Sequence, residues 1–390
     1  MEEITVGLIA APELPESIAR HLIDYLPDLL SKLVEKNIHW KTELVVDTLT
    51  GAAKDAQDIM AEAKTIKKSK GWTYAICLTD LPIYAGNNIV LADANIAAGV
   101  AQISLPSFGA FPMKKRVKRT IIQLVSEIYF GQGQDETIEM APKGIGLLSQ
   151  RKQRSLYKIL VDTFQFATIR RIKPHHMDNI TVRFIIIPRM NARVRILMGM
   201  TYANRPWTIM PSFKSVVAIA FGTGAYGLIF TTLWQLSVSY NMFRFLGLSV
   251  VAISSMMIWI IFSHNLWETA HDTPNRHMRI LYNSTTICTL GVAVLIYYMV
   301  LFFLFLIAVS VFVPPSLYAQ ATGLGDHVSF SNYVRLAWLV TSVATIAGAI
   351  GAGLENGDRV RNVTYGNRQR NRYQIIKQQK ESAAAQESDQ

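Results

Sequence analysis

The sequence has few charged residues and only two cysteines. Charged residues make up 17% of its 390 residues, whereas soluble domains carry about a quarter. A large share of the chain is therefore expected to lie in a membrane. Cys77 and Cys288 fall in an apparent buried strand and an apparent membrane helix, which excludes a disulfide framework and zinc-binding cysteine spacing. The N-terminus is acidic and lacks the basic region and long apolar stretch of a signal peptide, so we expect none.

Motifs that bind nucleotides or mark common catalytic sites are also missing. No GxGxxG follows the first apparent strand, where APELPES stands instead, and no GxxxxGK(S/T) occurs. The patterns HExxH, GxSxG and CxxC are absent as well. The sequence therefore predicts no cofactor and no recognisable catalytic motif, although distant residues can still gather into a site.

Four apolar segments have the length that a membrane-spanning helix needs, about 20 residues. They cover approximately residues 216–238, 243–263, 287–313 and 333–353. None has an Asp, Glu, Lys or Arg in its middle, which argues against a proton-coupled transporter. We expect an all-α four-helix transmembrane bundle over residues 215–354, after a basic connector at 131–214 and before a basic, disordered tail at 355–390.

The basic excess lies outside the first third of the chain. Residues 1–130 hold 14 basic and 15 acidic residues, and the remaining 260 hold 25 and 13. The short flanks richest in Arg and Lys precede the first segment, separate the second from the third, and follow the fourth. The positive-inside rule then places both termini and the loop at 264–284 in the cytoplasm. We expect anionic lipid headgroups at these flanks and no nucleic-acid partner.

Small residues four positions apart occur in the first and fourth apolar segments. Examples are Ala218 with Gly222, Ala220 with Gly224, and Ala347 with Gly351. Such spacing lets two helix backbones approach closely. It fits either a contact between copies in a homo-oligomer or packing within one bundle.

Strands alternate with helices in residues 1–130. Apparent strands cover residues 4–10, 39–47, 72–79, 89–91 and 99–104, and helical patterns cover 15–36, 52–68 and 113–129. Pro27 is expected to kink or split the first helix. The alternation predicts a cytoplasmic α/β domain with a parallel three-layer sheet. In the connector we expect a helix over 151–173, on the inner leaflet or packed on this domain, then a strand at 180–187 and a helix at 191–203.

Polar residues near the expected strand ends are the candidate ligand-binding residues, because ligands of parallel sheets bind beyond the carboxyl ends of the strands. These candidates are Asp80, Asn87 and Asp93. A carboxylate at Asp80 could hold a ribose, a metal or a switch hydrogen bond. The alternative is that Asp80 caps the turn at Leu81-Pro82.

One group of residues has the spacing of metal ligands. His264, Glu268 and His271 would share one face of a helix, and Glu-x-x-His is the spacing of carboxylate di-metal sites. The alternative is an exposed polar stretch at the membrane edge.

Five short motifs carry a resemblance that covers most of the chain. They are CLTDLP (77–82), ISLPSFGAF (103–111), GMTYANRPW (199–207), HNLWE (264–268) and RLAWL (335–339). With these motifs the chain resembles an uncharacterised family of multi-pass membrane proteins of Gram-positive bacteria. The resemblance transfers no catalytic residue. Some members carry a folate-dehydrogenase name, which implies a glycine fingerprint at the first βα turn, and this sequence departs from that pattern.

These features predict a membrane protein whose cytoplasmic domain senses a ligand or a partner and couples to the bundle. A membrane-tethered enzyme using Asp80 and Asp93 is the second hypothesis. A small oligomeric pore or transporter is the third.

Overall fold

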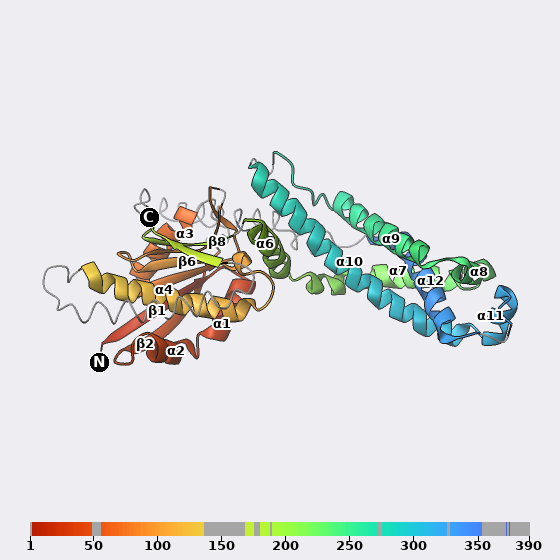
Figure 1. Ribbon diagram of the computed structural model, residues 1–390, viewed down its shortest axis with the longest axis horizontal. Helices are drawn as coiled ribbons and strands as arrows, with labels where there is room; N and C mark the ends of the chain where they lie inside the picture. The colour runs from red at the N-terminus through yellow and green to blue at the C-terminus, as the bar shows by residue number, and fades with distance from the viewer. Residues whose placement is uncertain are drawn as a thin grey trace, which may run out of the picture. The chain divides into compact units, whose positions relative to one another are not determined.

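A computed structural model describes residues 2–48, 56–86, 88–135, 168–174, 180–187, 189–271, 275–325, 328–352, 372 and 374. The chain divides into two compact units. The α/β unit comprises Met1–Ala203 with Gln369–Gln390, and the helical unit comprises Asn204–Arg368 (Figure 1).

An eight-stranded mixed sheet is the framework of the α/β unit, with strand order β2-β1-β3-β6-β5-β8-β7 and β4 paired to β5. The strands are β1 (Glu3–Ala10), β2 (His39–Val46), β3 (Tyr74–Thr79), β4 (Ile83–Ala85), β5 (Asn88–Asn95), β6 (Val100–Ser104), β7 (Thr168–Ile172) and β8 (Val182–Ile187). The first four strands in this order are parallel, and the remaining pairings are antiparallel. The expected parallel sheet therefore forms in one half only, because the turn between β5 and β6 is too short for a parallel crossover.

Helices cover this sheet on both faces. They are α1 (Leu14–Leu22), α2 (Leu26–Leu33), α3 (Ala56–Lys70), α4 (Met113–Asp135) and α6 (Arg189–Ala203), with a 3₁₀ turn η2 (Leu105–Phe108). The helix expected over 15–36 is split, and Pro27 lies in the first turn of α2. The crossovers β1→β2 and β2→β3 run in opposite directions along the sheet, so right-handed connections put α1 and α2 on one face and α3 on the other. Ile9 and Cys77 accordingly share a buried cluster with α3.

The expected connector contributes part of the sheet. β7 and β8 both lie in it, so the boundary expected at residue 130 moves to Ala203. The helix expected over 151–173 is wrong at residues 168–172, which form β7. There Ile169 is buried and Arg171 donates to Glu127 on α4, so this basic side chain joins β7 to α4. Residues 151–167 lie outside the described residues.

The helical unit contains η3 (Pro206–Phe213), α7 (Lys214–Gly227), α8 (Thr231–Ser239), α9 (Met242–Ser263), α10 (Arg276–Phe312), α11 (Pro315–Thr322) and α12 (Phe330–Ala352) (Figure 1). Among the described residues, α9 and α10 are each long and apolar enough to cross a membrane. The pair Pro206–Gly227 and Thr231–Ser239 passes the same test only together and is bent by 92° at its break. The segment expected at 216–238 is thus not one straight helix. α12 covers the residues of the fourth expected segment but is not among the helices that pass this test, and a four-helix transmembrane bundle remains a prediction.

Small residues allow close packing within the helical unit. A Cβ added at Gly224 would lie 2.2 Å from Cζ of Phe305, and one added at Gly348 would lie 2.9 Å from Cβ of Ala220. Gly224 of α7 and Gly348 of α12 therefore allow close packing against neighbouring helices of the helical unit. A Cβ added at Gly222 would meet nothing within 4 Å, so a homo-oligomer through that side of α7 remains a prediction.

Candidate functional site

The sheet has a topological switch point between β1 and β3. The chain leaves β1 toward β2 on one side, and it leaves β3 toward the strands on the other side. In open α/β sheets, ligands bind in the crevice at the carboxyl ends of the strands at such a point. The residues after Ala10 and the carboxylate of Asp80, which directly follows β3, lie at these ends. The candidate residue Asp80 thus lies at the switch point of the sheet, and a ligand site there remains a prediction.

Asp80 is buried there and pairs with an arginine from the far end of the chain. Arg372 Nη1 donates to Asp80 Oδ1 at 2.8 Å, and its Nη2 donates to the Pro12 carbonyl at 3.3 Å. Nη2 also lies 3.9 Å from Glu13 Oε1. The side chains of Asp80 and Arg372 are 1% and 6% exposed. One guanidinium therefore bridges the ends of both strands that flank the switch point.

The turn after Asp80 is held by its neighbours. The Leu81 N–H donates to Thr79 Oγ1 at 3.1 Å, and Ser104 Oγ donates to the Leu81 carbonyl at 2.7 Å. A side-chain cap for this turn is thus supplied by Thr79. The Asp80 carboxylate accepts from Arg372, and both the binding role and the turn-capping alternative remain predictions.

Three of the groups near the guanidinium are hydrogen-bond acceptors. They are the Asp80 carboxylate, the Pro12 carbonyl and, slightly farther away, the Glu13 carboxylate. A phosphate site at a first βα turn instead presents backbone N–H donors to the ligand. The chemistry of this site therefore suits a cation rather than a dinucleotide.

Asp93 lies in a separate buried ion pair. Arg183 Nε donates to Asp93 Oδ1 at 2.7 Å and its Nη2 donates to Oδ2 at 3.0 Å, while Gln102 Nε2 donates to Oδ2 at 3.1 Å. Both Gln102 and Arg183 are cross-strand neighbours of Asp93, and the Asp93 side chain is fully buried. This geometry favours a structural role for Asp93, holding β6, β5 and β8 together. The third candidate, Asn87, lies outside the described residues.

The three expected metal ligands do not share a helix face. α9 ends at Ser263, and the segment from His264 to His271 is not helical. The backbone of Glu268 instead docks on α10: its N–H donates to Asn283 Oδ1 at 2.8 Å, and Asn283 Nδ2 donates to its carbonyl at 3.1 Å. His264 and Glu268 are buried and His271 is exposed. Across the part of the chain that the structure describes, no three His, Cys, Asp or Glu side chains gather as metal ligands.

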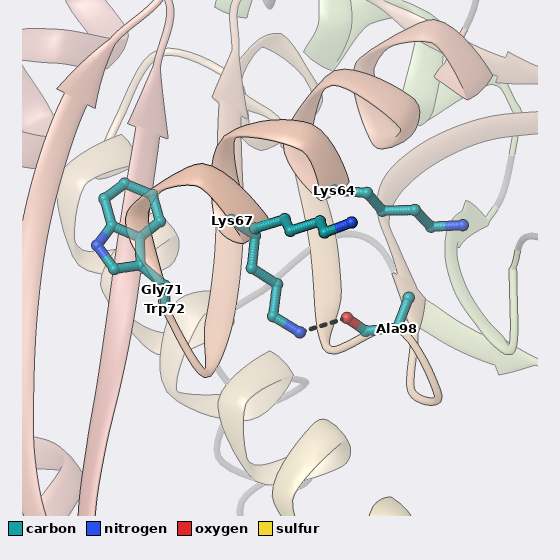
Figure 2. Close-up of a pocket in the computed structure, with 6 residues that line it drawn as sticks. Lys64, Lys67, Gly71, Trp72 and Ala98 are labelled. Carbon is teal, nitrogen blue, oxygen red and sulfur yellow. Dashed lines mark hydrogen bonds between the residues drawn. The ribbon is translucent and has the colours of Figure 1, made fainter.

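A lysine-lined hollow of about 360 Å³ lies at the other end of β3 (Figure 2). Its lining includes Lys64, Lys67, Lys68 and Trp72. Lys67 Nζ donates to the Ala98 carbonyl at 2.7 Å, and burial lowers the pKa of Lys67. Lys67 and Lys68 belong to the last turn of α3, where the helix dipole favours positive charge. That position accounts for the gathered lysines, so the hollow is a weaker functional candidate than the switch point.

Three of the motifs that carry the family resemblance meet in the α/β unit. CLTDLP and ISLPSFGAF are joined by the Ser104–Leu81 hydrogen bond, and the rings of Phe111 and Tyr202 join ISLPSFGAF to GMTYANRPW, with centroids 5.1 Å apart. Comparison of the chain with protein-family models, curated proteins and solved structures gives no match. The functional argument therefore rests on geometry.

Sequence reasoning missed two residues of these sites, Arg372 and Arg183. Arg372 stands in a basic run that the positive-inside rule already accounted for. The only hint of Arg372 in the sequence is indirect: Asp80 is a carboxylate expected after a buried strand, and such a carboxylate requires a cationic partner when desolvated. That signal does not say which arginine provides the partner.

Proposed function

We propose that this chain is an integral membrane protein whose cytoplasmic α/β unit senses a ligand or a partner at the β1–β3 switch point and couples it to the helical unit. The observation that carries the proposal is the bridge that Arg372 forms between Asp80 and the Pro12 carbonyl. Asp80 precedes every helix of the helical unit in the chain, and Arg372 follows the last of them. The ion pair therefore closes a loop of chain that contains the whole helical unit.

This closure gives a physical route from ligand to membrane segment. A ligand that takes the place of Arg372 releases the segment that follows α12. The equilibrium shifts only by the difference in the ligand's affinity for the open and the closed state. A sensor built in this way needs no catalytic group, in keeping with the missing motifs.

The membrane part of the proposal comprises four spans, the first broken between α7 and α8, with both termini in the cytoplasm of a bacterial cell. Large apolar side chains on α9 support it, since Phe243, Val250 and Phe262 are 82%, 63% and 76% exposed. Large exposed apolar side chains of this kind are suited to contact with lipid. The basic flanks would then meet anionic headgroups. The resemblance to the Gram-positive membrane-protein family belongs to the same proposal.

The enzyme alternative has less support. Asp93, its second proposed carboxylate, already accepts three hydrogen bonds from buried partners. A folate dehydrogenase of the dinucleotide-binding kind also needs N–H donors at the first βα turn, where this chain presents the Pro12 carbonyl.

The orientation is tested by cysteine labelling in intact cells. In a background of Cys77→Ala and Cys288→Ser, we expect Ala384→Cys to react with a membrane-impermeant maleimide only after the membrane is permeabilised. Ser316→Cys, in the α11 segment between the last two expected spans, is the matched control and should react in intact cells. Labelling of Ala384→Cys in intact cells would contradict the proposed topology.

The sensing role is tested with a metabolite panel on the full chain in detergent. We expect at least one compound to raise the melting temperature by about 2 °C or more, which corresponds to roughly 1 kcal/mol for a unit of this size. The Asp80→Asn variant should lose that response. A panel without any response, together with a pull-down that retrieves no partner, would refute sensing.

A further inference from the structure

The switch-point site matches the shape of a guanidinium group. Two different nitrogens of Arg372 donate to two acceptors that belong to different strand ends, Asp80 Oδ1 and the Pro12 carbonyl. A guanidinium carries its donors in a fixed planar fork, whereas an ammonium is a compact point charge. The two acceptors lie at the ends of β1 and β3, and this arrangement favours a guanidinium over an ammonium.

Burial strengthens the match. Asp80 is 1% exposed and Arg372 is 6% exposed, so water is displaced from both charged groups. A desolvated carboxylate is stable only with a charged, hydrogen-bonding partner. A ligand that replaces Arg372 at this site is therefore expected to supply a positive charge and two donors, as Arg372 does.

Arg372 is held at the site by the chain that carries it. A tethered group acts at an effective concentration in the millimolar range. A competing ligand must therefore be present at millimolar concentration, or bind more tightly through contacts that Arg372 does not make. Removing the Arg372 side chain should increase the apparent affinity for such a ligand. In that variant Arg372 no longer occupies the site, so every molecule is in the state that can bind the ligand.

We propose that the β1–β3 switch point is a guanidinium-recognition site and that its ligand is a small molecule bearing a guanidinium group, which competes with Arg372. The inference rests on the proposed sensing function and names the ligand class for the same site. Glu13, which is 46% exposed beside the guanidinium, provides a second carboxylate for such a ligand.

Chemical rescue of the Arg372→Ala variant tests this. The reporter is Cys77 in a Cys288→Ser background of the full chain in detergent. Cys77 is fully buried in β3 and burial raises its thiol pKa, so it reacts with maleimide only when the α/β unit opens. We expect Arg372→Ala to lower the melting temperature, followed by this reaction, by about 3–5 °C, because Asp80 loses its charged partner. The loss stays within this range because water can enter the vacated site and solvate Asp80 in part.

About 10 mM methylguanidinium, above the effective concentration of a tethered group, should restore at least half of that loss. Methylammonium at the same concentration should not. The Arg372→Ala/Asp80→Asn double variant should respond to neither compound, and Arg20→Ala, whose side chain is 65% exposed, should behave as wild type. Equal rescue by methylammonium, or no rescue by methylguanidinium, overturns the proposal.

A second measurement needs no variant. Trypsin must take an arginine side chain into its own pocket, so cleavage after Arg372 requires release of its guanidinium from Asp80. Methylguanidinium should raise cleavage after Arg372 about threefold relative to cleavage after Arg20, as expected for a shifted two-state equilibrium. An unchanged ratio overturns the proposal.

The two proposals fail in different ways. A compound without a guanidinium group that stabilises wild type through Asp80 leaves sensing in place and overturns guanidinium recognition. Rescue by methylguanidinium with no response to any metabolite or partner supports recognition and refutes sensing.

Discussion

Replacing Arg183 with Ala is expected to lower the free energy of unfolding of the α/β unit by about 3–5 kcal/mol, the cost of leaving a buried charge without its partner. Arg183 donates twice to Asp93, and the side chains are 5% and 0% exposed. Water does not reach the Asp93 carboxylate, because its side chain is fully buried. The remaining donor, Gln102 Nε2, supplies one hydrogen bond and no charge.

The measurement is the urea dependence of Cys77 labelling in the Cys288→Ser background. Cys77 is the cross-strand neighbour of Gln102, so it reports on the part of the sheet that the substitution disturbs. Arg20→Ala is the matched control, because its exposed pair with Glu16 on α1 is worth at most about 0.5 kcal/mol. A loss below about 1 kcal/mol for Arg183→Ala would show that Asp93 does not depend on this partner, and would revive its candidacy as a ligand-binding residue.

Apolar replacement separates a structural pair from a functional one. The triple variant Asp93→Leu, Gln102→Leu and Arg183→Met should regain at least half of the stability lost in Arg183→Ala, since well-packed apolar groups often substitute for a buried ion pair. It should also keep the response of the switch point to its ligand. Loss of that response in a stable triple variant would assign Asp93 to the site.

The predictable parts of the fold are those set by local pattern. Alternating strands and helices, the split of the first helix at Pro27 and the strand end before Asp80 all follow from neighbouring residues. Pairings between distant residues leave no such pattern: Arg372 and Asp80 are 292 positions apart, and Arg183 and Asp93 are 90 apart. Sequence reasoning thus locates the carboxylate at the switch point and misses the arginine that occupies it.

The wrong expectations have a related cause. Hydropathy records composition over many residues, so it does not show the break between Gly227 and Thr231 that bends the first apolar segment by 92°. The metal hypothesis assumed that α9 continues past Ser263. The helix ends there, and Asn265 adopts a positive φ of 50°, so positions three and four apart no longer share a face.

Gly199→Ala is the second substitution with a large expected effect. A Cβ at Gly199 on α6 would lie 2.1 Å from the Pro106 carbonyl oxygen of η2. That oxygen belongs to the backbone and cannot rotate away, so α6 and η2 must separate. Overpacking costs typically 1–3 kcal/mol and occasionally more, while alanine gains up to about 1 kcal/mol over glycine within a helix. A contact of 2.1 Å with a backbone oxygen belongs at or above the upper end of that range, so after the helix-propensity gain we expect a net loss of about 2–3 kcal/mol in the free energy of unfolding.

Gly131→Ala is the control for this substitution. Gly131 also lies inside a helix of the α/β unit, α4, but the three heavy atoms nearest to its added Cβ all belong to the side chain of Ile96, with Cδ1 and Cγ2 at 2.8 Å. Ile96 can change rotamer, so the helix-propensity gain should offset most of the strain and leave a change below about 1 kcal/mol. Both variants are measured by Cys77 labelling in urea.

The Gly199 result decides what two of the resembling motifs mean. Gly199 opens GMTYANRPW, and Pro106 lies within ISLPSFGAF. If Gly199→Ala is destabilised as expected and still responds to methylguanidinium once Arg372 is also replaced by Ala, the two motifs serve the close packing of α6 on η2. A Gly199→Ala variant as stable as wild type would contradict that close approach. A stable variant that no longer responds would place the motifs in the recognition site itself.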